Sequence, residues 1–295
     1  MSIAFLKRRP LLALYVVGVL LLLVTACLWA YKQAIDPERV FWNAIDRGMR
    51  TTGVTIKAEQ NNGGSTMKQT LQYSLGADNR SYARTTLTQP GTIVVNEMIG
   101  TPTTDYTRYA SITTDQKGKD GHKLDFSKIL GVWAKSSQRQ LFSQAALGTG
   151  LPLGGMVVPV ASLSPDLRDN LMRQIREQEV YSTDFSKVTK QHANGRLQYA
   201  YDVKIKPMAY ARLMKSFAQG IGLHDLDQLD PNRFNTQQDL RVRLTVDVVS
   251  HHVVTAALPA GNYTQTYHSY DVPVGVQLPS NTISFDELQN RLRKL

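Results

Sequence analysis

Histidine is the side chain best suited to proton transfer near neutral pH, and the chain contains six of them. His251 and His252 are adjacent, so their side chains would point to opposite faces of a strand, and neither has a partner at a metal-ligand spacing. We expect this pair to lie in a turn. The other four histidines stand alone along the sequence, so no catalytic dyad is indicated.

Three further patterns are compared with known catalytic or binding motifs. Asp225, Asp227 and Asp230 are spaced loosely like a calcium loop, but Asp230 stands where that loop needs Gly and Thr236 where it needs Glu. Gly148-Thr149-Gly150 lacks the glycine spacing of a dinucleotide site. No GxSxG nucleophile motif occurs. The sequence therefore predicts a protein that is not an enzyme and that has no metal and no cofactor.

A long stretch without any charge runs from Gln140 to Pro165 and combines Gly, Pro and large apolar residues. It contains too many helix breakers to cross a membrane as a helix. Such a segment either fills the core or forms a mobile cover over an apolar cavity, and both interpretations stay open. The candidate ligand-binding side chains on it are Leu151, Leu153, Met156, Val157 and Val158.

The net charge is +10, but Lys and Arg are scattered as single residues rather than as a basic block with interleaved aromatics. Nucleic acid is therefore not an expected partner. A basic domain fits a position near anionic lipid or cell-wall polymer, although a merely soluble charged surface explains the same charge.

Residues 10–31 predict a membrane anchor. Twenty residues, LLALYVVGVLLLLVTACLWA, contain no charge, and at about 1.5 Å per residue they span a bilayer core of roughly 30 Å. Lys7, Arg8 and Arg9 precede the run, so residues 1–9 are expected in the cytoplasm and residues 36–295 outside it. The expected location is the cytoplasmic membrane of a bacterium, crossed once.

The same residues also have the features of a lipoprotein signal peptide, because Val24-Thr25-Ala26-Cys27 resembles a lipobox. Cys27 is then a candidate for lipidation. The apolar run continues beyond this cysteine and no flexible tether follows it, so we expect the uncleaved helix. Cys27 is the only cysteine, so the remainder of the chain has no internal disulfide.

The pattern after residue 35 predicts one α+β domain. Period-two alternation with short turns dominates, interrupted by stretches of helical spacing. The expected helices lie at 36–49, at 125–147, after Ser164, after Pro207 and after Ser284, where Ser284 and Glu287 form a capping box. The expected strands lie between 51 and 114, on both sides of Asn194-Gly195, and between 239 and 276.

The segments AIDPERVFWNAIDRGMRTTGVTIKAEQ, TIVVNEMIGTPTTDYTRYASI, LQYAYDVKI, DLRVRLTVDVV and YDVPVGVQLP follow one another in this order. The order resembles that of the LolA/LppX-like lipoprotein carriers of bacterial envelopes. The resemblance implies a curved antiparallel sheet, wrapped as an incomplete barrel with helices covering its concave face. It also implies a cavity for acyl chains, and hence a tethered module that binds lipid or lipid-linked molecules.

Two other functions stay open. The first is an envelope protein-interaction domain with a filled core and no ligand cavity. The second is a cell-wall-modifying enzyme, against which the missing motifs count.

Overall fold

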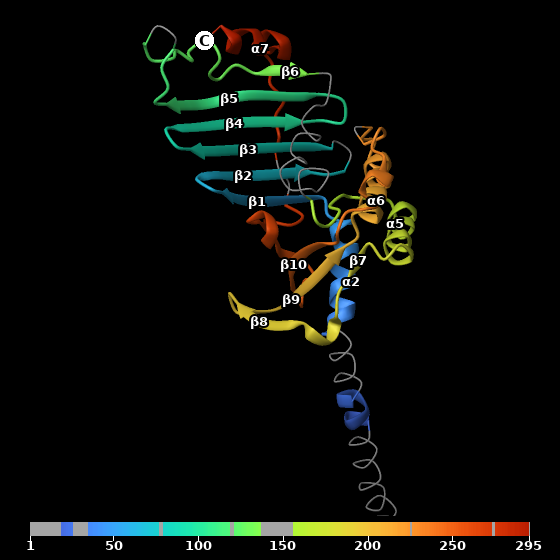
Figure 1. Cartoon of the computed structure of the whole chain (residues 1–295). Helices are drawn as coiled ribbons and strands as arrows, with labels where there is room; N and C mark the ends of the chain where they lie inside the picture. The colour runs from blue at the N-terminus through green and yellow to red at the C-terminus, as the bar shows by residue number, and fades with distance from the viewer. Residues whose placement is uncertain are drawn as a thin grey trace, which may run out of the picture.

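The computed structural model describes residues 19–25, 35–76, 79–118, 121–136, 156–224, 226–272 and 275–294. These residues form an α+β fold around one curved, unclosed sheet of thirteen strands (Figure 1). The strand order is β13-β6-β5-β4-β3-β2-β1-β12-β11-β10-β9-β7, and β8 pairs with β9. Of the pairings between these strands, only that of β13 with β6 is parallel. The expected α+β class and the open curved sheet are confirmed.

The strands are β1 (Gly53–Asn62), β2 (Ser65–Ser74), β3 (Arg80–Gln89), β4 (Thr92–Gly100), β5 (Asp105–Thr114), β6 (Ala134–Ser136), β7 (Tyr181–Ser182), β8 (Thr189–Ala193), β9 (Arg196–Ile205), β10 (Leu240–Asp247), β11 (Val253–Leu258), β12 (Tyr263–His268) and β13 (Ile283–Ser284). The α-helices with assigned bounds are α2 (Pro37–Gly48), α5 (Pro165–Glu177), α6 (Pro207–Gly220) and α7 (Phe285–Arg293).

The meander β1–β5 forms as expected because alternating polar and apolar residues are joined by tight turns. Gly63 and Gly64 both have positive φ between β1 and β2, where a residue with a Cβ would be strained. The β8–β9 hairpin turns at Asn194 and Gly195, with φ of 53° and 72°, which is the pattern of a type I′ turn. Strand β12 pairs with β1 and so joins the two halves of the sheet.

The main core lies on one face of this sheet. Helix α2 buries Val40, Phe41 and Ile45 completely, because apolar residues recur every three to four positions along it. These side chains form one cluster with Ile56 of β1, Tyr201 of β9 and the apolar face of α6. Figure 1 shows α2, α5 and α6 together beside the β7–β10 part of the sheet.

A smaller apolar cluster lies at the opposite end of the sheet. Leu288 of α7 packs there with Ile129 and Ala134. The Ser284 hydroxyl accepts a hydrogen bond of 3.1 Å from the Glu287 amide, which confirms the expected cap of α7. Between the two clusters, Met67, Leu87 and other inward side chains of β2–β4 are only half-buried.

The prediction of a helix at 125–147 is wrong for residues 125–136. Residues 134–136 form β6 instead, and the chain makes only a turn around Ile129. Gly131 adopts a φ of +73° and its amide donates to the Tyr109 carbonyl of β5 at 2.8 Å. Sheet pairing and a left-handed glycine therefore override the helical spacing. Residues 137–147 lie outside the described residues.

Most of the expected membrane anchor, residues 10–31, lies outside the residues that the structure describes. Only residues 19–25 of it are described, and they are helical. Within the described ranges, no helix combines the length and the apolar character needed to cross a membrane. Cys27 is not among the described residues.

Candidate functional site

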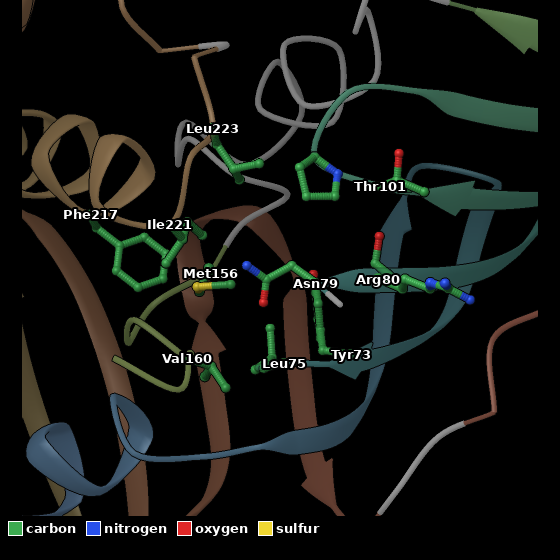
Figure 2. A pocket seen from close by; sticks show the side chains of 13 residues that line it. Tyr73, Leu75, Asn79, Arg80, Thr101, Met156, Val160, Phe217, Ile221 and Leu223 are labelled. Carbon is green, nitrogen blue, oxygen red and sulfur yellow. The ribbon is translucent and has the colours of Figure 1, made fainter. Parts of the chain in front are cut away.

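A pocket opens where the adjoining ends of β2, β3 and β4 face the end of α6 and residues 156–160 (Figure 2). Its empty space is about 530 Å3 with the open mouth included, and about 60 Å3 of it can hold the centres of water-sized groups. This volume of about 60 Å3 is far below the roughly 300–1,000 Å3 of pockets that enclose drug-sized ligands. The pocket therefore suits a short chain end and not a whole lipid.

Thirteen residues line the pocket, and apolar side chains contribute most of its wall. They are Tyr73, Leu75, Asn79, Arg80, Ser81, Gly100, Thr101, Pro102, Met156, Val160, Phe217, Ile221 and Leu223.

Three segments far apart in sequence build the apolar wall. Phe217 and Ile221 lie about one turn apart at the end of α6, and Leu223 follows them. Figure 2 shows Leu75 and Met156 facing these side chains across the pocket. Phe217, Met156 and Leu223 are each more than nine-tenths buried. An apolar group that enters here loses contact with water on several sides, which is the condition for favourable hydrophobic binding.

Tyr73 adds an aromatic ring to the same wall. Burial, together with the nearby Tyr263, raises the pKa of its phenol above the usual value. Its hydroxyl therefore stays protonated at physiological pH, and this part of the wall is uncharged.

The mouth of the pocket is more polar. The Asn79 side-chain oxygen accepts a hydrogen bond of 3.1 Å from the Gly76 amide, and the Thr101 hydroxyl donates one of 3.0 Å to the Thr104 carbonyl. Figure 2 shows the Asn79 amide directed toward Met156 and the Arg80 guanidinium pointing away from the pocket. The mouth can therefore accommodate the polar part of a ligand without placing a charge inside.

The candidate side chains from the sequence divide into three groups. Met156 lines the pocket. Val157 and Val158 are each 1% exposed and belong to the main core, so their side chains do not line the pocket. Leu151 and Leu153 lie outside the described residues.

Two buried tyrosines fix the segment that carries Met156. The Tyr210 hydroxyl donates a hydrogen bond to the Met156 carbonyl, and the Tyr181 hydroxyl donates one of 2.8 Å to the Val157 carbonyl. Burial raises the pKa of both phenols, so they remain donors. Two carbonyls that would otherwise be unsatisfied in the core are thereby paired.

The same segment also docks on the end of α2. The Ala161 amide donates to the Gly48 carbonyl and the Leu163 amide to the Met49 carbonyl, each at 3.0 Å. A Cβ on Gly48 would lie 2.6 Å from the Pro159 oxygen, so only glycine allows this close approach. Residues 156–163 are thus held by hydrogen bonds at several points.

The sequence did not single out Phe217, Ile221 or Leu223, nor the two tyrosines that hold the segment. The apolar face of α6 was visible as periodicity, but periodicity marks the core in general and does not separate a pocket wall from it. The adjacency of this face to Met156 arises only in the folded chain.

The residues first considered for chemistry have structural roles. His251 and His252 were expected in a turn; they lie in the connection between β10 and β11, directly after the turn residues 248–250. The His252 ring stacks on Tyr270 with 4.0 Å between centroids. Asp227 accepts hydrogen bonds from Gln219 and His224, and Asp230 caps a 3-10 turn through the Asn232 amide. Asp225 lies outside the described residues. Among those that are described, no group of three acidic, His or Cys side chains could hold a metal ion.

No protein-family model matches the chain, and no curated protein is similar to it in sequence. The structure describes an α+β domain with an open curved sheet. Its candidate site is the apolar pocket at the end of the main core.

Proposed function

We propose that this chain is a membrane-tethered, extracytoplasmic binding module that holds the apolar end of a lipid or lipid-linked ligand in this pocket. The observation that supports the proposal is an apolar pocket at the edge of the core, open to solvent and edged by polar groups. Pockets of this composition are the usual sites of small apolar ligands. The charge-free run at 10–31 supports the tether.

The size of the pocket limits how much of the ligand it can bury. Each buried methylene contributes about 0.8 kcal/mol, so a short end of about four or five contributes about 3–4 kcal/mol in total. That free energy corresponds to affinity in about the millimolar range before ordering costs are subtracted. The remaining affinity has to come from polar contacts at the mouth, where Asn79 and Thr101 lie.

A chain-length series tests this proposal. Fluorescently labelled acyl amides of two to ten carbons are titrated into residues 35–295, after circular dichroism has shown that this piece is folded. Affinity should rise about fourfold per methylene and then level off before the longest probes, when the pocket is full. A rise that continues through the whole series would contradict a pocket of this size.

A filling variant with a matched control shows where the probe binds. Leu75 is half-buried and lines the pocket, so Leu75→Phe should occupy the inner space and weaken binding by about tenfold or more. Leu197 is also half-buried against the core but does not line the pocket. Leu197→Phe should leave binding unchanged, and equal effects of the two variants would place the probe elsewhere.

The alternative, an interaction domain without a ligand cavity, is favoured by the burial of Val157 and Val158 in a filled core. It predicts that no acyl amide of the series binds. The same titration therefore distinguishes the two functions.

A further inference from the structure

The outer face of the sheet, opposite the main core, carries a second concavity. It is a groove of about 480 Å3 across β12, β1, β2 and β3. Three cations, Lys57, Lys68 and Arg84, and one acid, Glu59, line it together with threonine hydroxyls such as that of Thr70. The groove exposes polar and apolar surface in similar proportion, whereas the pocket on the other face is almost wholly apolar, so the two differ in chemistry.

Two of the three groove cations, Lys57 and Arg84, belong to a row that runs across the strands. Thr266 pairs with Lys57, Lys57 with Thr70, and Thr70 with Arg84. The row continues through Glu97 to Arg108. Directly paired residues of neighbouring strands point to the same face, so these side chains all lie on the outer side. Lys57, Arg84 and Arg108 recur on every second strand, about 10 Å apart.

A buried carboxylate organises the two arginines of the row. Glu97 is 3% exposed and accepts hydrogen bonds of 2.7 Å from both Arg84 Nη1 and Arg108 Nε. The Tyr82 hydroxyl donates a third, of 2.9 Å, and Trp133 packs on the Arg108 guanidinium at 4.6 Å. Each guanidinium has five N–H donors, so both keep donors beyond those given to Glu97. The carboxylate fixes their direction while the cluster remains positively charged.

Lys57 and Lys68 add charge beside this cluster. Lys68 is 66% exposed and lies 3.9 Å from Glu59, a separation and exposure at which an ion pair contributes little. Lys57 is exposed and makes no ion pair with any of the described residues. The groove thus offers spaced, accessible cations over a floor of threonine hydroxyls.

We propose that this groove binds a linear anionic polysaccharide. Regularly spaced cations match anionic groups that repeat along a chain, and the threonine hydroxyls between them match sugar hydroxyls, which both donate and accept hydrogen bonds. A concave groove fits a single chain better than a flat lipid surface. No Phe, Tyr or Trp lines the groove among the described residues, and stacking on such rings is how proteins commonly bind single-stranded nucleic acid. This site is independent of the apolar pocket.

Binding is measured with the full-length chain in non-ionic detergent, using dextran sulfate and polygalacturonate as probes and neutral dextran as the uncharged reference. We expect binding of at least one anionic polymer, with log affinity falling linearly as log salt rises. If only one is bound, the anionic group is identified as sulfate or carboxylate. Equal binding of neutral dextran, or tighter binding of a single-stranded oligonucleotide than of either polymer, would overturn the proposal.

Charge-reversal variants locate the site. Lys57→Glu with Lys68→Glu should weaken polymer binding by about tenfold or more, because both reversals place repulsion inside the groove. The control pair Lys123→Glu with Lys128→Glu makes the same change in net charge at exposed positions outside the groove. The affinity of this control variant for the anionic polymer should stay within about twofold of that of the wild type. Equal losses in the two pairs would show that only net charge matters, and the groove would be refuted as the site.

Discussion

Replacing Gly48 by alanine tests whether the segment behind the pocket is held by its close contact with α2. The added Cβ would meet the Pro159 oxygen at 2.6 Å and a Val158 methyl at 3.3 Å. Because the first of these is a backbone atom, the segment must move by several tenths of an ångström. That movement strains the two hydrogen bonds that Gly48 and Met49 accept from Ala161 and Leu163.

Two opposing effects determine how much Gly48→Ala changes the free energy of unfolding. Overpacking a close contact costs about 1–3 kcal/mol, whereas alanine is favoured over glycine at a helical position by about 0.5–1 kcal/mol. We therefore expect Gly48→Ala to lower the free energy of unfolding by about 1–2 kcal/mol. Met156 and Val160 line the pocket and lie on the displaced segment, so acyl-probe affinity should fall as well.

The assay is equilibrium urea unfolding, with Gly275→Ala as the matched control. A Cβ on Gly275 meets nothing within 4 Å, and its φ is outside the left-handed region. That variant should be neutral or stabilised by up to about 1 kcal/mol. If Gly48→Ala is as stable as Gly275→Ala, the contact with Pro159 does not constrain the segment and the reasoning fails.

Two further substitutions test buried polar groups. Glu97→Gln should lower the free energy of unfolding at pH 7 by about 1–3 kcal/mol, measured by urea unfolding, because it weakens charge-assisted hydrogen bonds to two arginines. Burial alone would raise the pKa of Glu97, but the hydrogen bonds from Arg108 and Tyr82 and the charges of Arg108 and Arg84 outweigh burial and hold it below 4.5. A carboxylate whose pKa is depressed in the folded state stabilises the fold. This stabilisation is fully present above the unfolded pKa, and it is lost as the pH falls through the folded pKa. The gap between wild type and variant should therefore narrow below about pH 4.5 and stay constant from pH 6 to 8, and a gap that widens in acid would contradict this assignment. Tyr181→Phe removes the donor to the Val157 carbonyl and should cost about 1–3 kcal/mol in the same assay, and a change below 0.5 kcal/mol would mean that the carbonyl finds another donor.

The class and most of the elements could be predicted from the sequence because they depend on local patterns. Helix α2 follows from Pro37 and a single apolar face, and the β8–β9 hairpin from Asn194-Gly195, a pair that favours positive φ. The Ser284 cap likewise acts within one turn. Sequence periodicity failed near Ile129, where pairing with β5 decided the structure.

The two candidate sites could not be predicted in this way, because each depends on residues brought together by long-range pairing. The pocket joins the end of β2 to the end of α6, about 140 positions later in the chain. The sequence of the charge-free segment between them is compatible both with core and with a cover over a cavity. The outer row of cations depends on the register of β12, β1, β2, β3, β4 and β5, and a slip of one residue would turn each side chain to the other face. Local patterns thus determined which elements form. Tertiary packing alone decided that Met156 faces a pocket while Val157 and Val158 fill the core, because burial is a property of the neighbours that the folded chain supplies.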